Sequence, residues 1–403
     1  MPKSNNGLNK KLNKYVYFDY AASASANPSS VHRAGVEVKT KLQIARREVA
    51  DILSARPEEI IFTSGGTESN NLAIQGVVLN WQGKILPHII TTNIEHPSVL
   101  ETYKLLAKRK LVEITIVPVE ANGIVDPKKI KKEIKKNTVL VSVMYANNEI
   151  GTIQPIKEIA KEIRHFKKIR SENFSFPLFH TDAVQAVNYL DLNVEKLGVD
   201  LLSLSGSKIE GASKVGVLYK KKTVKLAKVF GGGDQEGGVR PGTENLPEIL
   251  KFSLALKTTQ KIKEKESKRL EKLRDYFLKE LQNKNLKFSR VLGLGPDHLE
   301  NFDFNFVVNG DLKNRLPNNV NITFPNIPSD LLVIELSEKG IMASAKSACK
   351  SGESGGSYVI KAIRNNDEIG GVRFSLGRDT TKKDIDYTIK VLDKILMKLK
   401  KWY

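Results

Sequence analysis

The sequence predicts an α/β protein whose large domain holds a mainly parallel, seven-stranded sheet, followed by a smaller α+β C-terminal domain. Seven short runs rich in β-branched residues alternate with stretches of helical periodicity, the usual order of strands and crossover helices in a parallel sheet. Most of these runs are apolar throughout, so we expect strands that are buried on both faces. Beyond about residue 255 the chain becomes highly charged and helical, which indicates a second domain.

The first expected element is a helix over residues 36–53, where Val38, Leu42, Ala45, Val49 and Ile52 recur at helical spacing on one face. The seven expected strands follow at 59–64, 88–93, 113–119, 138–145, 177–182, 200–205 and 215–220. This succession predicts a large domain over residues 16–255, preceded by a basic tail over residues 1–15.

A long charged helix over residues 258–282 opens the expected small domain, residues 256–403. Strands are expected at 321–324 and 371–376. Apolar residues at helical spacing predict a closing helix that carries Ile385, Ile389, Leu392 and Leu396.

Composition excludes several classes of protein. The chain has 403 residues, 40% of them hydrophobic, and no uncharged apolar stretch approaches the roughly 18 residues of a membrane helix. The basic N-terminus has no apolar segment behind it, so no secretory signal is expected. The single cysteine, Cys349, permits no internal disulfide and no cysteine-cluster metal site. We therefore expect a soluble, cytoplasmic protein that binds neither membrane nor metal.

The formal net charge of +20 raises the affinity of the chain for polyanions in general. The lysines are nevertheless spread along several expected helices, as at 131–136 and 261–274, and no arginine-rich stripe interleaved with aromatic residues is present. We expect no direct nucleic-acid binding, while contact with an acidic protein or with tRNA stays open.

A glycine pair follows the first expected strand, in the stretch IIFTSGGTESNNLAI at 60–74. Gly65 and Gly66 form a turn before a helix that starts near Thr67 or Glu68, and exposed backbone N–H groups at such a helix start bind phosphate. The stretch lacks the Gly-Lys-Ser/Thr of a Walker loop. Two interpretations stay open: a phosphate cradle, or an ordinary strand-to-helix turn capped by Thr67.

Two charged residues lie at the ends of expected buried strands. Asp182 ends the strand at 177–182, and a buried carboxylate needs a partner, either the start of a following helix or the protonated ring nitrogen of a cofactor. Lys208 follows the strand at 200–205, where strand ends line the crevice of an open α/β sheet. Lys208 is either an ordinary solvated lysine or a desolvated amine that can form a Schiff base.

Other polar residues follow further expected strands, namely His96, Asn147 and Asn148, and Arg373 lies in the expected small domain. In one open sheet such strand ends can converge on a single crevice. A phosphate turn, an acid and a lysine are what pyridoxal phosphate requires of its protein. The constellation therefore favours a pyridoxal-phosphate enzyme.

Six further stretches occur in order along the chain: FTSGGTESNNLAI, EHPSVL, NNEIGTIQPI, HTDAVQAV, RPGTEN and RFSLGR. They closely resemble the motifs of the NifS/IscS-type cysteine desulfurases, in the class V group of pyridoxal-phosphate enzymes. The resemblance runs from YFDYAAS to DIDYTIKVL and implies the type I pyridoxal-phosphate transferase fold and a homodimer. It also implies L-cysteine as substrate and a sulfur acceptor, such as an iron–sulfur scaffold protein or a tRNA-thiolation enzyme.

The resemblance assigns cofactor-binding roles to residues of this chain. Lys208 would form the Schiff base, Asp182 would hold the ring nitrogen protonated, and Gln185 would bind the phenolic oxygen. His96 would stack on the ring and assist proton transfer. The residues implied to bind the phosphate are Gly66, Thr67, Ser205 and Ser207, with Thr243 reaching the phosphate of the neighbouring subunit.

The implied reaction removes sulfur from L-cysteine and leaves L-alanine. Asn148 and Arg373 would hold the substrate carboxylate, Arg373 through a bidentate fork. Cys349 aligns with the nucleophile of the family, whose thiolate attacks the substrate sulfur and becomes a persulfide. It lies between Lys346 and Lys350, which favour the thiolate, in a stretch of small and polar residues, so we expect a mobile loop over 343–357.

The chain departs from the family pattern at Ser207, which stands where the family usually has a histidine, and we expect weaker retention of the cofactor. The stretch FDYAASASANPSSVH is also shorter than its counterpart, which would open the site or alter the acceptor surface.

Two other functions stay open. One is a different pyridoxal-phosphate lyase or aminotransferase, which needs no thiol, and the other is a non-catalytic sulfur-carrier scaffold.

Overall fold

The computed structural model describes residues 16–23, 26–170, 176–212, 214–283, 286–288, 304–324, 327–345, 356–364 and 370–399. The predicted nucleophile Cys349 lies outside these residues, as do Lys346, Lys350 and the expected basic tail at 1–15.

Seven strands form one sheet in the order β1-β7-β6-β5-β4-β2-β3. They are β1 Ile60–Thr63, β2 His88–Thr92, β3 Glu113–Val117, β4 Thr138–Ser142, β5 Leu178–Asp182, β6 Leu201–Ser205 and β7 Gly216–Lys220. The five strands from β6 to β3 in this order pair in parallel, whereas β7 runs antiparallel to both β6 and β1. The predicted α/β class and mainly parallel seven-stranded sheet are confirmed.

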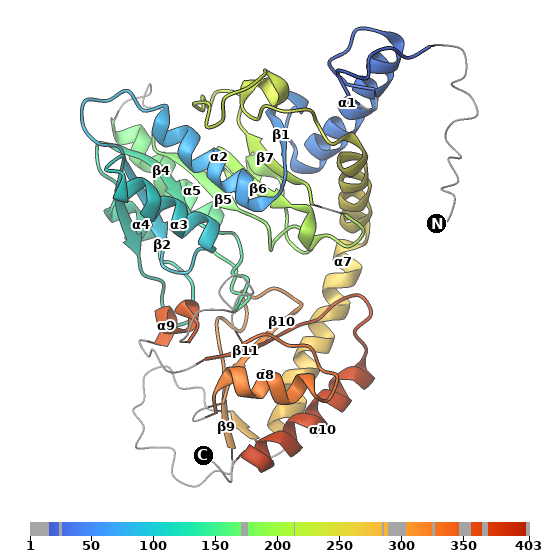
Figure 1. The fold of residues 1–403 in the computed structure, drawn as a ribbon. Coiled ribbons are helices and arrows are strands. Elements are labelled where there is room, and N and C mark those ends of the chain that lie inside the picture. Colours follow the sequence, from blue (N-terminus) through green and yellow to red (C-terminus); the bar gives the residue numbers. More distant parts are fainter. Residues whose placement is uncertain are drawn as a thin grey trace.

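Helices cover both faces of this sheet (Figure 1). One apolar core joins the sheet to α1 Arg33–Leu53, α5 Ile156–Arg170 and the first part of α7 Leu246–Asn283. A second core joins the other face to α2 Gly66–Leu79 and α3 Pro97–Lys108. Successive residues of a strand divide between the two cores, as Leu201 and Leu202 do, because side chains alternate along a strand. The short helices are α4 Pro127–Lys132, α6 Val194–Leu197, η1 Pro57–Glu59, η2 Gly206–Lys208 and η3 Gln235–Gly238.

The strands are buried as expected except at one edge of the sheet. Every residue of β2, β4, β5 and β6 is buried. In β3, which lies at one edge, only Val117 is buried, whereas β1 at the other edge is buried throughout. The expectation of burial on both faces is therefore wrong for β3.

A second sheet of four strands has the order β11-β10-β9-β8. Its strands are β8 Leu286–Phe288, β9 Phe304–Val308, β10 Asn319–Thr323 and β11 Val372–Ser375. The helices in this part of the chain are α8 Ser329–Ser337, α9 Tyr358–Arg364 and α10 Lys382–Leu399. The two strands and the closing helix expected here are present, and their apolar core includes Phe277 of α7. Helix α7 runs past both sheets in Figure 1. Because it spans Leu246–Asn283, the expected boundary near residue 255 falls inside it. The division into two domains stays a prediction.

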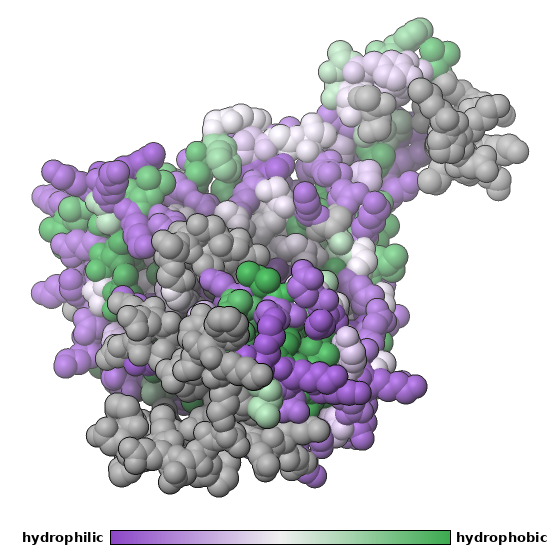
Figure 2. Space-filling view, turned by 60° about the horizontal axis from the view of Figure 1, so that its bottom comes forward, coloured by the Kyte–Doolittle hydropathy of each residue, from purple (hydrophilic) through white to green (hydrophobic). Residues whose placement is uncertain are grey.

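The surface carries a mixture of polar and apolar residues. Hydrophilic residues dominate the outline of the face in Figure 2. No helix in the described ranges is long and apolar enough to span a membrane. The N-terminal segment and α1, which reach away from the rest of the molecule in Figure 1, expose several large apolar side chains, namely Val16, Phe18, Tyr20, Val31, Val36 and Ile44.

Candidate active site

A pocket of about 460 Å³ lies at the carboxyl ends of the central strands. Its walls come from the start of α2, from residues that follow β2, β4, β5 and β6, and from β11 of the second sheet. The lining includes the following residues singled out from the sequence: Gly66, Thr67, His96, Asn148, Asp182, Gln185, Ser205, Ser207, Lys208 and Arg373. The structure thus brings these residues together, although they are scattered over 308 positions of the chain from 66 to 373.

The start of α2 and the end of β6 contribute groups that can bind an anion. The N-cap residue of α2 is Gly65, and no side chain caps the helix, so the alternative in which Thr67 acts as the cap is wrong. The N–H groups of a first helical turn have no acceptor within the helix and attract negative charge. The hydroxyls of Ser205 and Ser207 lie 2.9 Å apart beside this turn. A Cβ atom at Gly66 would come within 2.8 Å of Val184 Cγ2, so glycine keeps this corner of the pocket open.

A hydrogen-bonded chain connects Asp182 to His96. Asp182 is buried, and its Oδ2 accepts a hydrogen bond of 2.8 Å from Asn70 Nδ2, while Oδ1 accepts the Val184 N–H at 3.0 Å. Asn70 Nδ2 also donates to Ser98 Oγ at 2.8 Å, and Ser98 Oγ lies 2.8 Å from His96 Nδ1. The next helix after Asp182 is α6, which begins at 194, so the helix-capping alternative is wrong.

The His96 ring is held in one tautomer by these contacts. Its Nδ1 accepts the backbone N–H of Ser98 at 3.1 Å, so a neutral imidazole carries its proton on Nε2. Burial lowers the pKa of His96, an effect that Asp182 opposes and Lys208 reinforces. A neutral imidazole can stack on an aromatic ring and offers Nε2 for proton transfer.

Lys208 closes the short helix η2, which begins directly after β6. Its main-chain oxygen accepts a hydrogen bond of 2.6 Å from Asn188 Nδ2, and Asn188 also lines the pocket. The Lys208 side chain is exposed, as the solvated alternative expects, but it is exposed within the pocket, where a ligand carbonyl could meet it.

Arg373 and Asn148 form a part of the pocket suited to a carboxylate. Arg373 Nη1 donates to the main-chain oxygen of Asn148 at 2.8 Å. Arg373 Nε and Asn148 Oδ1 are buried without a hydrogen-bond partner among the described residues, which is unusual for buried polar atoms and indicates a missing ligand. Burial lowers the pKa of the Arg373 guanidinium, and the Glu149 carboxyl group acts in the opposite direction.

Glu95 lies fully buried behind the pocket and was not singled out from the sequence. Thr92 Oγ1 donates to its carboxyl group at 2.6 Å, and the Met144 N–H contacts both of its oxygens at 3.0 Å. Burial raises the pKa of Glu95 to about 8, with a further contribution from Asp182. Its carboxyl group is therefore protonated at neutral pH.

Asn70 and Ser98 are the lining residues that sequence reasoning missed most directly. Asn70 lies four positions after Gly66, so the helical repeat places both on one face of α2, and this signal could have identified it. Ser98 lies two positions after His96, in the first turn of α3, and its hydroxyl joins the His96 ring to Asn70. Asn318 and Ser375 come from the second sheet, and nothing in their local sequence indicates the pocket.

Thr243 and Asn147, also singled out from the sequence, do not line the pocket. Thr243 is exposed, and Cys349 lies outside the described residues. Asn147 is buried beside the pocket, where its Nδ2 donates to the Ile94 oxygen at 2.9 Å and its Oδ1 accepts the Glu149 N–H at 2.8 Å. Asn147 therefore holds the turn that carries Asn148.

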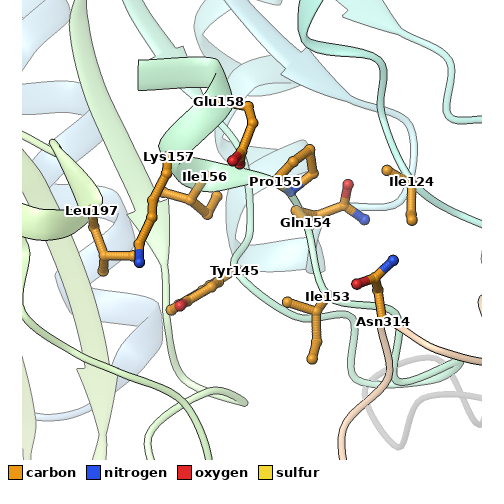
Figure 3. Close-up of a pocket in the computed structure, with 10 residues that line it drawn as sticks. All are labelled: Ile124, Tyr145, Ile153, Gln154, Pro155, Ile156, Lys157, Glu158, Leu197 and Asn314. Carbon is orange, nitrogen blue, oxygen red and sulfur yellow. The ribbon is translucent and has the colours of Figure 1, made fainter. Parts of the chain in front are cut away.

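A second pocket, of about 330 Å³, is shown in Figure 3. Tyr145 and Gln154 line it, whereas the neighbouring Met144 lines the first pocket, so the chain segment that begins after β4 separates the two. None of the residues predicted to be catalytic or cofactor-binding lines this second pocket. The chemistry therefore belongs to the first pocket.

Known proteins resemble this chain over almost its whole length. The curated protein "Cysteine desulfurase IscS" of Dictyoglomus turgidum is 40% identical, with 96% of each chain covered. The protein of the same name from Methanosarcina thermophila is 41% identical, with 94% of this chain and 87% of that protein covered. A solved "NifS-like protein" is 33% identical with a TM-score of 0.80, covering 93% of this chain and 92% of its own. Another, "SspA in complex with cysteine", is 30% identical with a TM-score of 0.69, covering 87% and 90%. The aminotransferase class-V family model matches residues 12–388, and the chain belongs to this family.

Proposed function

We propose that this protein is a pyridoxal-phosphate-dependent cysteine desulfurase, which converts L-cysteine to L-alanine and takes the sulfur onto Cys349. The observation that carries the proposal is a single pocket that holds an amine, Lys208, a buried carboxylate, Asp182, and a guanidinium, Arg373, beside an anion-binding helix start. Relatives named cysteine desulfurase that cover nearly the whole chain support it.

The residues of the pocket fit pyridoxal phosphate. The first turn of α2 and the hydroxyls of Ser205 and Ser207 suit the phosphate, and Gly66 leaves space for it. Asp182, held by Asn70, suits a protonated ring nitrogen, and Lys208 offers the amine for the Schiff base. The bound cofactor supplies an electron sink for the carbon next to the substrate amine.

The residues of the chain would orient the substrate and move its protons. The unpaired Arg373 Nε would donate to the carboxylate of L-cysteine, with the amide nitrogen of Asn148 as a second donor, which fixes the position of its Cα atom. The Lys208 amine would take the proton from Cα and return it. His96 Nε2 carries a proton beside these atoms, and the Ser98 N–H keeps it on that nitrogen.

Sulfur transfer requires a thiolate, and Cys349 is the only cysteine in the chain. The Cys349 thiolate attacks the substrate sulfur, so that a sulfur–sulfur bond forms as the carbon–sulfur bond breaks. The carbon keeps the electron pair of the broken bond and takes up a proton, which gives L-alanine and a persulfide. No external oxidant or reductant is needed in this balance.

A homodimer and a later sulfur acceptor complete the proposal. The large apolar side chains exposed on the N-terminal segment and α1 suit burial against a second copy, and the exposed Thr243 would then reach the phosphate of that copy. We also propose that 16–255 and 256–403 act as a large and a small domain. An iron–sulfur scaffold protein or a tRNA-thiolation enzyme would take up the persulfide sulfur.

Incubation with L-cysteine and a reductant tests the function, with sulfide and alanine as the measured products. We expect both products from the wild-type holoenzyme and neither from Lys208→Ala. Cys349→Ser is expected to bind L-cysteine, seen as a spectral change of the cofactor, without releasing sulfide. Sulfide release that survives in Cys349→Ser would favour another lyase of the family. A wild-type protein that binds the cofactor and yields no sulfide would refute the proposal.

A further inference from the structure

The turn of Asn148 and Glu149 receives four hydrogen bonds from the C-terminal part of the chain. Arg373 Nη1 donates to the Asn148 main-chain oxygen at 2.8 Å. Asn319 Nδ2 and Asn321 Nδ2, both on β10, donate to the Glu149 main-chain oxygen at 3.0 Å. Ser357 Oγ donates to Glu149 Oε2. This turn is therefore a point at which the pocket wall and the second sheet are joined.

Ser357 ties the beginning of α9 to this turn. Its hydroxyl oxygen accepts the N–H groups of Val359 and Ile360, both at 3.2 Å, while its proton is donated to Glu149. Glu149 is 2% exposed and Ser357 4% exposed, so water does not compete for this contact. The next residue, Tyr358, donates from its hydroxyl to the main-chain oxygen of Glu95 at 2.7 Å. The start of α9 is thus held at two points beside the pocket.

Ser344 is held at the same pocket wall from the other direction. Its N–H donates to the Arg373 main-chain oxygen at 3.1 Å, and the Arg373 N–H donates to the Ser344 oxygen at 2.7 Å. Ser344 and Ser357 bracket the segment that contains Cys349. The two ends of this segment are therefore attached to the wall that holds the proposed carboxylate-binding group. Ser344 is bonded to Arg373 itself, and Ser357 is bonded to Glu149, the residue next to Asn148.

We propose that Glu149 is a positioning residue, which acts through Ser357 to fix the point where the chain returns from Cys349 to the pocket wall. This inference rests on the proposed function, because it concerns how the nucleophile is brought to a substrate held by Arg373. A hydrogen bond between buried groups is costly to break, since the group left behind loses its partner and gains no water. Small misplacements of a reacting group are in turn costly for the rate, by up to about a hundredfold for 1 Å.

Ser357→Ala tests the inference, with Ser253→Ala as a matched control. Ser253 is 2% exposed and donates to a glutamate, Glu48 Oε2, at 2.7 Å, but it joins α7 to α1 away from the pocket. Both variants remove a buried serine hydroxyl that donates to a carboxyl group, although Ser357 also accepts the N–H groups of Val359 and Ile360. In Ser357→Ala we expect the rate of persulfide formation on Cys349 at saturating L-cysteine to fall about tenfold, with KM changed less than about twofold. Ser253→Ala should keep the wild-type rate.

Two further measurements separate the inference from the proposed function. Limited trypsin cleavage after Lys346 and Lys350 in the holoenzyme needs no turnover, and we expect it to be faster in Ser357→Ala than in Ser253→Ala. Glu149→Gln keeps an amide oxygen that can accept from Ser357, so its rate should fall less than that of Ser357→Ala. Equal persulfide rates and equal trypsin rates in the two serine variants would overturn the inference. Absence of a persulfide in the wild-type protein would refute the proposed function, and trypsin cleavage would still decide the positioning role.

Discussion

Glu95 allows a quantitative test of the electrostatics behind the pocket. Its carboxyl group is fully buried, and burial raises its pKa to about 8 from an ordinary value of 4.5. Replacing it by glutamine in a Glu95→Gln variant keeps an oxygen that can accept from Thr92 Oγ1 and from the Met144 N–H. The substitution therefore removes the titration while it preserves the two hydrogen bonds that Oε1 accepts.

The sign of the effect follows from the raised pKa. Above pH 4.5 the unfolded chain releases the Glu95 proton, whereas the folded protein keeps it until about pH 8. The free energy of unfolding therefore decreases as pH rises through this window, by about 1.4 kcal/mol for each pH unit and by about 5 kcal/mol in total. Glu95→Gln should lack this part of the pH dependence.

Urea unfolding of the wild-type protein and Glu95→Gln between pH 5 and pH 8 measures the difference. We expect the wild-type midpoint to fall more steeply with pH than that of the variant. Glu48→Gln is a suitable control, because hydrogen bonds from Lys257 and Ser253 lower the pKa of Glu48, so that its titration lies below this window. Equal slopes in the wild-type protein and Glu95→Gln would refute the argument from burial.

Three further predictions concern the pocket. In Arg373→Lys the bidentate fork is lost, and we expect KM for L-cysteine to rise more than tenfold in steady-state assays, with a smaller change in kcat; an unchanged KM would contradict the role of Arg373. In Gly66→Ala the new Cβ meets Val184 Cγ2 at 2.8 Å. Overpacking of about 1.4 kcal/mol should weaken cofactor binding about tenfold, measured by absorbance titration of the apo-protein. An affinity equal to that of the wild-type protein would show that this corner of the pocket does not bind the phosphate. Ser207→His restores the imidazole of the family pattern and should tighten cofactor binding in the same titration. Equal affinity would show that serine in place of histidine at position 207 does not affect cofactor binding.

The strands could be predicted from the sequence because each is encoded locally. Runs such as VLVS and LLSLS are rich in apolar residues, and every residue of β4 and β6 is buried. The exposure of β3 could not be predicted in this way, since Ile116 is apolar and yet exposed, and the edge position alone does not explain it because β1 at the other edge is buried throughout. The same limit applies to β8 and β9, which were not expected and pair only with each other and β10.

The pocket could be predicted as far as it follows from strand ends. Asp182 and Lys208 could be identified from their positions at the end of β5 and after β6. The partner of Asp182 is Asn70, 112 positions earlier in the chain, and no local pattern connects the two residues. The partner of Glu149 is likewise not visible in the local sequence. Its contact with Ser357 spans 208 positions and joins parts of the chain that belong to separate sheets.

The position of Asp182 in the pocket depends on the register of three neighbouring strands. His180 lies two residues before Asp182, so both side chains point to the same face of β5. The His180 ring bridges Ser142 Oγ of β4 at 2.8 Å and Ser203 Oγ of β6 at 3.0 Å. Burial lowers the pKa of His180 to about 3, so this bridge stays uncharged at neutral pH. A shift of β5 by one residue would break both contacts and turn Asp182 to the opposite face. The buried histidine therefore fixes the register that delivers the carboxylate to the pocket.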